Sequence, residues 1–395
     1  MNKNLYTTNT PQSFWQVQED IPPEAWEDAI NQALPKLGMD AIDLASALHL
    51  SLGEGQFGPH HWQFSFAKRV YYQLKPLLPR RLTSMMRKVY SGSIEADFAL
   101  EWPAEARYAQ FLWECLRQVL LITGKDTLPF RSFWPEAKQA GFILTHDIET
   151  AEGQSFVSKV ADLEQQYGFA ASFNFIPERY SVDKALMAEL SERGFEIGVH
   201  GLHHDGKLFF SQKEFNRRAE KINQYLKEFN ARGFRTPLTH RNPQWMQSLK
   251  MDYDLSFFDS DPYEPIAGGT MSLWPFQIGH FLELPYTLPQ DYTLINVIRA
   301  SGPQLWLDKV DFLYQFNGMI LLNTHPDYLK DPVNWQVYEN FLKEMQTGRE
   351  TFWHALPCEA ADWWRSRQAA STASSAAPLS LASLKEGQLH IEAQS

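Results

Sequence analysis

The chain has 395 residues, of which 44% are hydrophobic and 21% are charged, and its formal net charge at pH 7 is −11. This balance is typical of a folded globular protein, and the length predicts roughly two or three domains. The negative charge argues against a general nucleic-acid-binding protein, because such a protein neutralises many phosphates with clustered Lys and Arg. We therefore expect no nucleic-acid partner.

The N-terminal residues MNKNLYTTNT lack the apolar core of a secretory signal, and the sequence contains no run of about 18 apolar residues that could cross a bilayer. We therefore expect a cytoplasmic protein without a transmembrane segment. Cys115 and Cys358 are the only cysteines of the chain. Two cysteines are too few for a disulfide framework or a thiolate metal site, so nitrogen and oxygen atoms must hold any metal ion.

Residues 1–138 show helical periodicity without alternation of strands and helices, which predicts a separate, mainly helical N-terminal region. Within it, residues 66–90 combine aromatic and aliphatic side chains with Lys and Arg, and no acidic residue lies between Lys68 and Lys88. Such a stretch can contact an anionic membrane surface or an anionic glycan. A solvated helix face is the simpler interpretation.

From Ala140 onward, short apolar runs alternate with longer amphipathic segments, as in successive βα units. Helices are expected between the strands at residues 155–167, 184–193 and 212–229. Seven parallel strands predict a distorted (β/α)7-type barrel over residues 139–368, with the chemistry at the strand ends. The predicted strands are Gly141–Thr145, Phe169–Phe175, Phe195–Val199, Gly233–Arg235, Leu255–Phe258, Phe281–Leu284 and Met319–Thr324.

The last segment, residues 369–395, begins with a run of Ala and Ser. This composition buries little apolar surface, so it predicts a flexible tail.

A pair of carboxylates marks the end of the first barrel strand. Alternation along a strand places Asp147 and Glu149 on the same face. Two carboxylates that converge repel each other unless a cation or a shared proton relieves the repulsion. Capping of the next helix is the alternative explanation.

Three histidines follow the third predicted strand, at His200, His203 and His204. If this segment turns helically, the i, i+4 spacing directs His200 and His204 to one side, at a separation that suits one metal ion. The pair is not a zincin motif, because Gly201 follows the first histidine and no Glu lies between the two.

Further polar residues follow later strands. Arg235 precedes Pro237 by two residues, Arg241 precedes Pro243 in the same way with Trp245 close by, and His325 follows the last predicted strand. The order along the chain is therefore a carboxylate pair, a histidine pair, an Arg-x-Pro segment and a terminal histidine.

This order resembles the polysaccharide deacetylase family, also called NodB-homology domains or carbohydrate esterase family four, over about residues 139–330. The resemblance implies that Asp147 is the general base, that His325 is the general acid, and that Arg235 orients Asp147, with Arg241 as the alternative. It also implies that Glu149, His200 and His204 bind a divalent metal, although exchanged roles of Asp147 and Glu149 remain open. The family further implies an acid that tunes His325, for which Asp254, Asp259 and Asp261 are the candidates.

The sequence departs from the family pattern at three positions. Ile148 stands where a second Asp is common, Gly201 where a hydroxyl residue is usual, and Asn323 where a Leu is expected. These departures leave open a catalytically inactive glycan-binding module.

Together the motifs imply a metal-dependent hydrolase that removes acetyl groups from an N-acetylated sugar or polysaccharide. The ligand set suits Zn²⁺, although Co²⁺, Ni²⁺ or Fe²⁺ fit it too. The expected partner is an acetylated glycan, and Arg241 and Trp245 are the candidate substrate-binding residues. The alternative is hydrolysis of another C–N amide or of an O-acetyl ester on the same fold.

Overall fold

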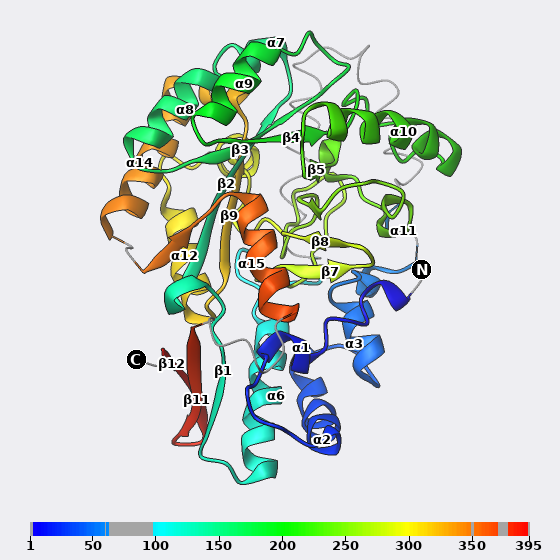
Figure 1. Ribbon diagram of the computed structural model, residues 1–395, viewed down its shortest axis with the longest axis vertical. Helices are drawn as coiled ribbons and strands as arrows, with labels where there is room; N and C mark the ends of the chain where they lie inside the picture. The colour runs from blue at the N-terminus through cyan, green and yellow to red at the C-terminus, as the bar shows by residue number, and fades with distance from the viewer. Residues whose placement is uncertain (1–2, 60, 63–97, 349–350, 370–377, 394–395) are drawn as a thin grey trace.

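The computed structural model describes residues 3–59, 61–62, 98–348, 351–369 and 378–393. The predicted basic stretch at residues 66–90 lies outside the described residues. In Figure 1 the barrel strands and their helices occupy the upper part, and the N-terminal helices lie below with a small three-stranded sheet. Within the described residues, no helix combines the length and the apolar character needed to cross a membrane.

The barrel is a curled sheet whose strands run parallel except for one hairpin strand. β2 lies at its centre, because it pairs with β9 on one side and with β3 and β10 on the other. From β3 the order continues through β4, β5, β6 and β8 to the antiparallel β7. The strands are β2 Ala140–Ile148, β3 Ala171–Phe175, β4 Glu196–His200, β5 Gly233–Arg235, β6 Tyr253–Asp254, β7 Phe276–Ile278, β8 Phe281–Glu283, β9 Met319–Thr324 and β10 Phe352–His354.

The two ends of this sheet approach each other without a strand ladder between them. The backbone amides of Thr287 and Leu288, which follow β8, donate to the carbonyl oxygen of Leu321 in β9 at 3.2 and 3.1 Å. Every residue of β2 and β9 is buried, as expected for parallel strands covered on both faces. The predicted distorted barrel, preceded by a helical region, is therefore confirmed. Within the described residues, β10 adds an eighth parallel strand to the seven that the sequence predicted.

One predicted strand is displaced along the chain. The ladder of β6 covers Tyr253–Asp254, whereas the sequence predicted residues 255–258. Beyond the ladder, the Phe257 amide donates to the Glu283 side chain, and Phe258 forms only an isolated bridge to Tyr286. Residues 255–258 are buried as predicted, but most of their backbone hydrogen bonds lie outside the ladder of β6.

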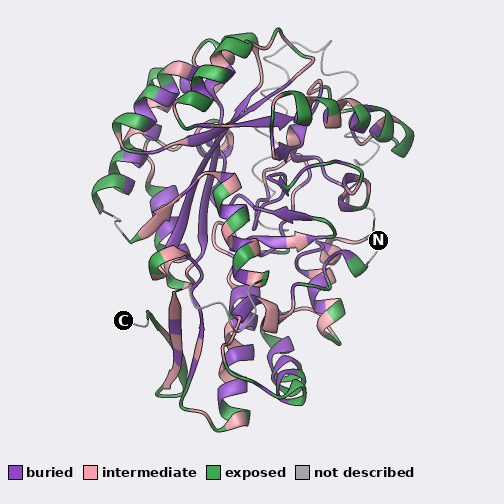
Figure 2. Cartoon of the chain, viewed as in Figure 1, coloured by how far each residue is buried: buried purple, intermediate pink, exposed green. Residues whose placement is uncertain are grey.

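The helices surround this sheet, and Figure 2 shows buried strands inside and exposed helix faces outside. Asp183 caps α9 and Ser211 caps α10, because the side chain of each accepts bonds from backbone amides of the first turn. The three predicted helices appear as α8, α9 and α10. The barrel helices are α7 Ala151–Gln154, α8 Val157–Gln166, α9 Lys184–Glu192, α10 Gln212–Glu228, η6 Pro237–Thr239, α11 Pro243–Met246, η7 Tyr292–Ile298, α12 Gln304–Gln315, α13 Pro326–Leu329, α14 Pro332–Gly348 and α15 Pro357–Ala369.

The N-terminal part packs against the base of the barrel through aromatic side chains. Trp113 of α6 stacks on Trp274 with ring centroids 5.5 Å apart, and Phe14 of α1 meets the same indole edge-on at 4.8 Å. The hydrophobic core is consequently continuous between the two parts. The elements here are η1 Lys3–Leu5, α1 Pro11–Trp15, α2 Pro23–Ala33, η2 Leu34–Leu37, α3 Leu44–Leu50, η3 Gly55–Phe57, α6 Arg107–Thr123, β1 Thr127–Arg131 and η5 Pro135–Ala137.

The C-terminal segment corrects one prediction. Residues 379–393 form a hairpin of β11 Leu379–Lys385 and β12 Gln388–Ala393, and β11 pairs with β1. The predicted flexible tail is therefore wrong for these residues, whereas residues 370–377 lie outside the described ones. Composition could not reveal this hairpin, because its backbone bonds go to a strand about 250 residues earlier. The domain boundary at residue 138 stays a prediction.

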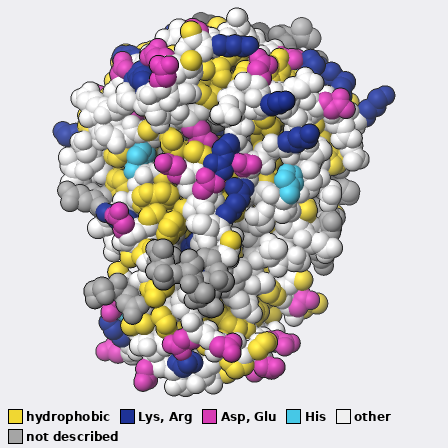
Figure 3. Space-filling model, in the orientation of Figure 1, with side chains coloured by type: hydrophobic (Ala, Val, Ile, Leu, Met, Phe, Trp, Pro, Cys, Tyr) yellow, Lys and Arg dark blue, Asp and Glu magenta, His cyan; other side chains and the backbone are white. Residues whose placement is uncertain are grey.

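The charged side chains on the face drawn in Figure 3 are mixed in sign. Lys and Arg side chains lie interspersed with Asp and Glu over the upper, barrel part of this face.

Candidate metal and catalytic site

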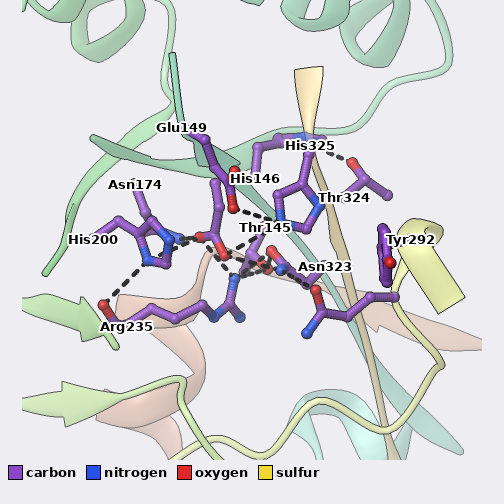
Figure 4. Close-up of polar contacts among 12 residues, drawn as sticks. Thr145, His146, Glu149, Asn174, His200, Arg235, Tyr292, Asn323, Thr324 and His325 are labelled. Atoms are coloured by element: carbon purple, nitrogen blue, oxygen red, sulfur yellow. Dashed lines mark hydrogen bonds and ion pairs between the residues drawn. The ribbon is translucent and has the colours of Figure 1, made fainter. Parts of the chain in front are cut away.

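The carboxyl ends of the parallel strands bring the predicted polar residues to one rim of the barrel. Asp147 lies near the end of β2, His200 ends β4 and Arg235 ends β5. His325 directly follows β9. In Figure 4, His200 and His325 lie on opposite sides of the cluster and Arg235 lies below it. Positions far apart in the chain thus meet because parallel strands end at the same edge.

Glu149, His200 and His204 form a candidate metal site at this rim. One ligand atom from each of Glu149, His200 and His204 lies within 4.8 Å of the others. The Nε2 atom of His204 is 2.8 Å from Glu149 Oε1, and the two imidazole centroids are 5.3 Å apart. This convergence of two nitrogens and one carboxylate matches the donor set of a divalent ion such as Zn²⁺.

The segment between the two histidines is a loop and not the helical turn that the spacing suggested. Gly201 and His204 both have positive φ angles, 62° and 53°. A Cβ on Gly201 would lie 2.2 Å from Cγ of Pro237. A hydroxyl residue at this position would therefore collide with the neighbouring loop, which explains why glycine replaces it.

The His200 imidazole is arranged as a metal ligand. Its Nδ1 atom lies 3.2 Å from the carbonyl oxygen of Arg235, an acceptor, so Nδ1 carries the proton. The Nε2 atom is buried and has no hydrogen-bond partner. Burial lowers the pKa of His200 to about 4, so the ring is neutral at pH 7. A buried, unpaired nitrogen lone pair beside Glu149 and His204 therefore fits a metal ion.

Asp147 sits within a set of donors. Asn174 Nδ2 and Arg235 Nη1 lie 3.1 and 3.2 Å from its Oδ1 atom, and Asn323 Nδ2 lies 3.0 Å from Oδ2. Burial alone would raise the pKa of Asp147, but the Arg235 charge and the other neighbours outweigh it and hold the pKa below its usual range. Asp147 is therefore ionised at neutral pH, as a general base must be.

Arg235 is the arginine that reaches Asp147. Its Nε atom donates to the Leu255 carbonyl at 2.7 Å, and Nη1 also donates to Thr145 Oγ1 at 3.0 Å. These bonds fix the guanidinium group against the rim of the barrel.

Arg241 lies elsewhere, and its predicted contact with substrate is not supported. Its guanidinium group is fully buried and donates to Glu54 of the N-terminal part, with Nε 2.8 Å from Oε2. A fully enclosed group cannot touch a substrate directly. Trp245 is half-buried and stacks on Phe209 with centroids 6.2 Å apart, so its substrate role stays a prediction.

His325 faces the same centre from the other side. Its Nε2 atom is 3.9 Å from both Asp147 Oδ2 and Glu149 Oε1, and its Nδ1 atom is 2.7 Å from Asp291 Oδ1. Burial alone would lower the pKa of His325, but the Asp291 carboxylate outweighs it and raises the pKa to about 10. The imidazole is therefore protonated at neutral pH and can act as an acid.

Asp291 corrects the prediction of the tuning acid, which was sought among three earlier aspartates. The Asp254 carboxylate accepts from Ser256 Oγ, and the Asp259 carboxylate forms an ion pair with Lys309. The backbone of Asp261 forms an antiparallel β-bridge with Gly268. The bonds of these three aspartates do not reach His325, whereas Asp291 also accepts the His325 backbone amide at 2.8 Å. Asp291 was missed because it belongs to no strand and caps the short helix η7.

Other supporting residues were also missed. Asn174 of β3 points to Asp147. A Cβ on Gly198 of β4 would lie 1.9 Å from the Oδ1 atom of Asn174, so the glycine leaves room for the Asn174 side chain. Asp327 accepts the Glu149 backbone amide at 3.2 Å and the Thr150 hydroxyl. The available signal was position alone, since Asn174 lies in a predicted strand and Asp327 follows His325 by two residues.

The sequence comparison agrees with the site. Residues 136–253 match the sequence model of the family described as polysaccharide deacetylase. The resemblance inferred from the motifs is thus confirmed over this region, which contains Asp147, Glu149, the histidine pair and Arg235. Asp291 and His325 lie beyond it. No curated protein matches the sequence significantly.

Several solved structures are similar to the barrel. A Mycobacterium smegmatis protein assigned as a polysaccharide deacetylase is 16% identical and covers 60% of this chain and 93% of its own, with a TM-score of 0.47. Puue allantoinase is 13% identical with the same coverages and a TM-score of 0.49. Peptidoglycan deacetylase PdaC from Bacillus subtilis is 13% identical and covers 58% of this chain and 94% of its own, with a TM-score of 0.39.

The match to the family model and the geometry of the rim point in the same direction. Residues 136–253 of the barrel, which carry two carboxylates and the histidine pair of the rim, are similar to the polysaccharide deacetylase family.

Proposed function

We propose that this protein is a metal-dependent hydrolase that removes acetyl groups from an N-acetylated sugar or polysaccharide. The observation that carries the proposal is the convergence of Glu149, His200 and His204, with Asp147 and His325 beside them. An ionised carboxylate and a protonated imidazole next to a metal-type ligand set are the groups that water attack on an amide requires.

Each side chain has a defined part in this reaction. A divalent ion held by Glu149, His200 and His204 would polarise the acetyl carbonyl and acidify the attacking water. Asp147 accepts the proton of that water, and Arg235 keeps its carboxylate oriented. The Nε2 atom of His325 then donates a proton to the leaving nitrogen, so that an amine departs.

Other functions on the same fold use the same groups. Hydrolysis of another C–N amide or of an O-acetyl ester requires the same base and acid, so only substrates can separate these reactions. The geometry of the site argues against an inactive glycan-binding module, because Asp147 and His325 both have hydrogen-bonded partners that direct them to one centre. The acetylated glycan is accordingly the proposed partner.

The deciding experiment is acetate release from a panel of oligosaccharides acetylated on nitrogen or on oxygen, with and without 1,10-phenanthroline. We expect release from N-acetylated members, loss with the chelator, and recovery with Zn²⁺, Co²⁺, Ni²⁺ or Fe²⁺. Glycan binding without any acetate release would identify a binding module instead. Release from O-acetylated members alone would identify an esterase.

A further inference from the structure

Asn323 stands between the general base and a second, deeper polar network. Its Nδ2 atom donates to Asp147 Oδ2 at 3.0 Å and to Gln290 Oε1 at 3.3 Å. Its Oδ1 atom accepts from Thr145 Oγ1 at 3.1 Å and from Arg235 Nη1. Asn323 is fully buried, so its amide bonds to these side chains and not to bulk water.

The orientation of this amide matters for the base. A side-chain amide turned by 180° has nearly the same shape but exchanges its donor and its acceptor. A turned Asn323 would present Oδ1 to the carboxylate of Asp147, which would replace a hydrogen bond with repulsion between oxygens. The position of the Asp147 carboxylate therefore depends on what holds the Asn323 amide.

Arg235 holds the amide on its Oδ1 side, and Gln290 and Glu264 hold it on its Nδ2 side. Gln290 Nε2 donates to Glu264 Oε1 at 2.8 Å, which leaves Gln290 Oε1 to accept from Asn323. The other carboxyl oxygen of Glu264 lies 2.6 Å from Thr239 Oγ1 of η6. The donors and acceptors thus follow one order: Gln290 donates to Glu264 and accepts from Asn323, and Asn323 donates to Asp147.

The position of Gln290 in the chain strengthens this connection. Gln290 is 7% exposed and immediately precedes Asp291, which holds His325. Two consecutive residues therefore support the two reacting groups, one through Asn323 and the other directly.

We propose that Gln290 and Glu264 are positioning residues for the general base, which they orient by fixing the donor face of the Asn323 amide toward Asp147. This inference rests on the proposed hydrolase function. It assigns a role to the asparagine that stands where the family has leucine, and it extends the support of the general base to a carboxyl group two amides away.

The first test uses 4-nitrophenyl acetate, whose leaving group needs no proton, so that its hydrolysis reports on the base and not on the acid. Gln290→Met keeps the side-chain length but removes both bonds, and Glu264→Gln allows the Gln290 amide to turn. Each should lower kcat by about tenfold, because one hydrogen bond in the chain is lost or reversed, while KM stays within about twofold. Metal content per chain should be unchanged.

The second test asks whether the effect passes through Asn323. In an Asn323→Leu background, Gln290→Met should lower kcat no further, because the amide that Gln290 orients is gone. An equal loss of kcat in both backgrounds would overturn the proposal, as would a change confined to KM or a loss of metal. Such results would mean that Gln290 acts on the fold or on the ligands.

Two matched substitutions control for the general effect of removing or changing a partly buried polar side chain. Gln247→Met removes bonds to the carbonyls of Pro243 and Ile278, at 3.0 and 3.2 Å, and Glu196→Gln changes a half-buried carboxyl at the start of β4. Neither side chain bonds to Asn323 or Asp147, so both variants should keep the parent kcat. A fall as large as that of the test variants would count against a specific role.

A separate measurement keeps this inference distinct from the proposed function. If the parent protein hydrolyses neither 4-nitrophenyl acetate nor acetylated glycans, the proposed function fails. The side-chain amide signal of Asn323 in a ¹H–¹⁵N spectrum then still reports on the network. Gln290→Met should shift that signal and Gln247→Met should not. An unshifted signal in Gln290→Met would overturn the inference.

Discussion

At the scale of single residues, His203 lies between two candidate ligands and yet turns away from them. Its Nε2 atom is 3.4 Å from Glu178 Oε2, whereas His200 and His204 face Glu149. His200→Ala and His204→Ala should each abolish stoichiometric metal binding, because three protein ligands leave no redundancy. His203→Ala is the control and should keep the metal. Elemental analysis of the purified variants decides this, and full occupancy in both ligand variants would contradict the metal assignment.

Asp147, near the end of β2, and Glu149, directly after it, should differ in their effect on metal content. Asp147→Asn should keep the metal and lower turnover by at least about a hundredfold, because it removes the general base. Glu149→Gln should lose the metal as well, since its Oε1 atom faces His204 at 2.8 Å. Metal analysis combined with acetate release separates the two roles. The opposite pattern would make Asp147 the ligand.

The acid should show itself in the pH profile. His325 must be protonated to act, so turnover of an acetamide falls as pH rises through its pKa, which Asp291 raises to about 10 against the opposing effect of burial. Asp291→Asn removes the raising charge and leaves the burial, so the alkaline limb should move to lower pH. The measurement is kcat against pH. An unmoved limb would assign the titration to another group.

A complementary variant removes the acid itself. His325→Ala should cut turnover of an acetamide severely and yet hydrolyse an activated aryl acetate almost as fast as the parent, because that leaving group needs no proton. An equal fall on both substrates would show that His325 is not the acid.

At the scale of elements, the turn after β4 depends on a glycine. Gly201 has φ 62° and no room for a Cβ beside Pro237, whereas Gly194, with φ 88° at the end of α9, has no heavy atom within 4 Å of that position. Gly194→Ala should lower the free energy of unfolding by about 1 kcal/mol from backbone strain alone. Gly201→Ala adds a collision and should cost about 3 kcal/mol.

Denaturant unfolding of both variants checks this difference. Gly201→Ala should also weaken metal binding. The glycine lies directly after His200 and begins the loop that carries His204, so a change in its backbone would move the two imidazoles relative to each other. Equal destabilisation by the two substitutions would mean that the Pro237 loop yields without cost.

The elements that the sequence predicted are those with local signals. Helices α8, α9 and α10 carry amphipathic patterns and end near glycines, and the apolar strands β2 and β9 are flanked by turns. The strands β7 and β10 were not predicted, although β5 and β8, which are equally short, were. β7 pairs with the neighbouring β8 in a hairpin, whereas β10 pairs with β2, about 210 residues earlier, so a local pattern could not reveal the pairing of β10.

At the scale of the whole molecule, a buried ion pair joins the N-terminal part to the barrel. Glu54 has φ 50° and accepts from Arg241, and its Oε1 atom also accepts from the Gly269 amide at 2.7 Å. Glu54→Ala would leave the Arg241 charge buried and unpaired, so it should lower the free energy of unfolding by about 3–5 kcal/mol.

The exposed pair of Glu19 and Lys125 provides the control, since both side chains are more than a third exposed. Glu19→Ala should cost at most about 1 kcal/mol, because solvent screens that pair. Urea unfolding of the two variants measures the difference. Similar small effects would show that the N-terminal part and the barrel are not coupled through Glu54.

The sequence by itself determined the barrel and the chemistry-bearing residues. Periodicity predicted seven strands, one of which is displaced along the chain. The residue types at their ends predicted Asp147, Glu149, His200, His204, Arg235 and His325 as site residues, because these signals lie within a few neighbouring positions. Only the tertiary structure decided what surrounds them. Asp291 beside His325, Asn323 beside Asp147, Arg241 against Glu54 and the hairpin on β1 each join segments more than 30 residues apart. Such contacts follow from how the sheet curls and which loops it brings together, and a local pattern carries no record of that.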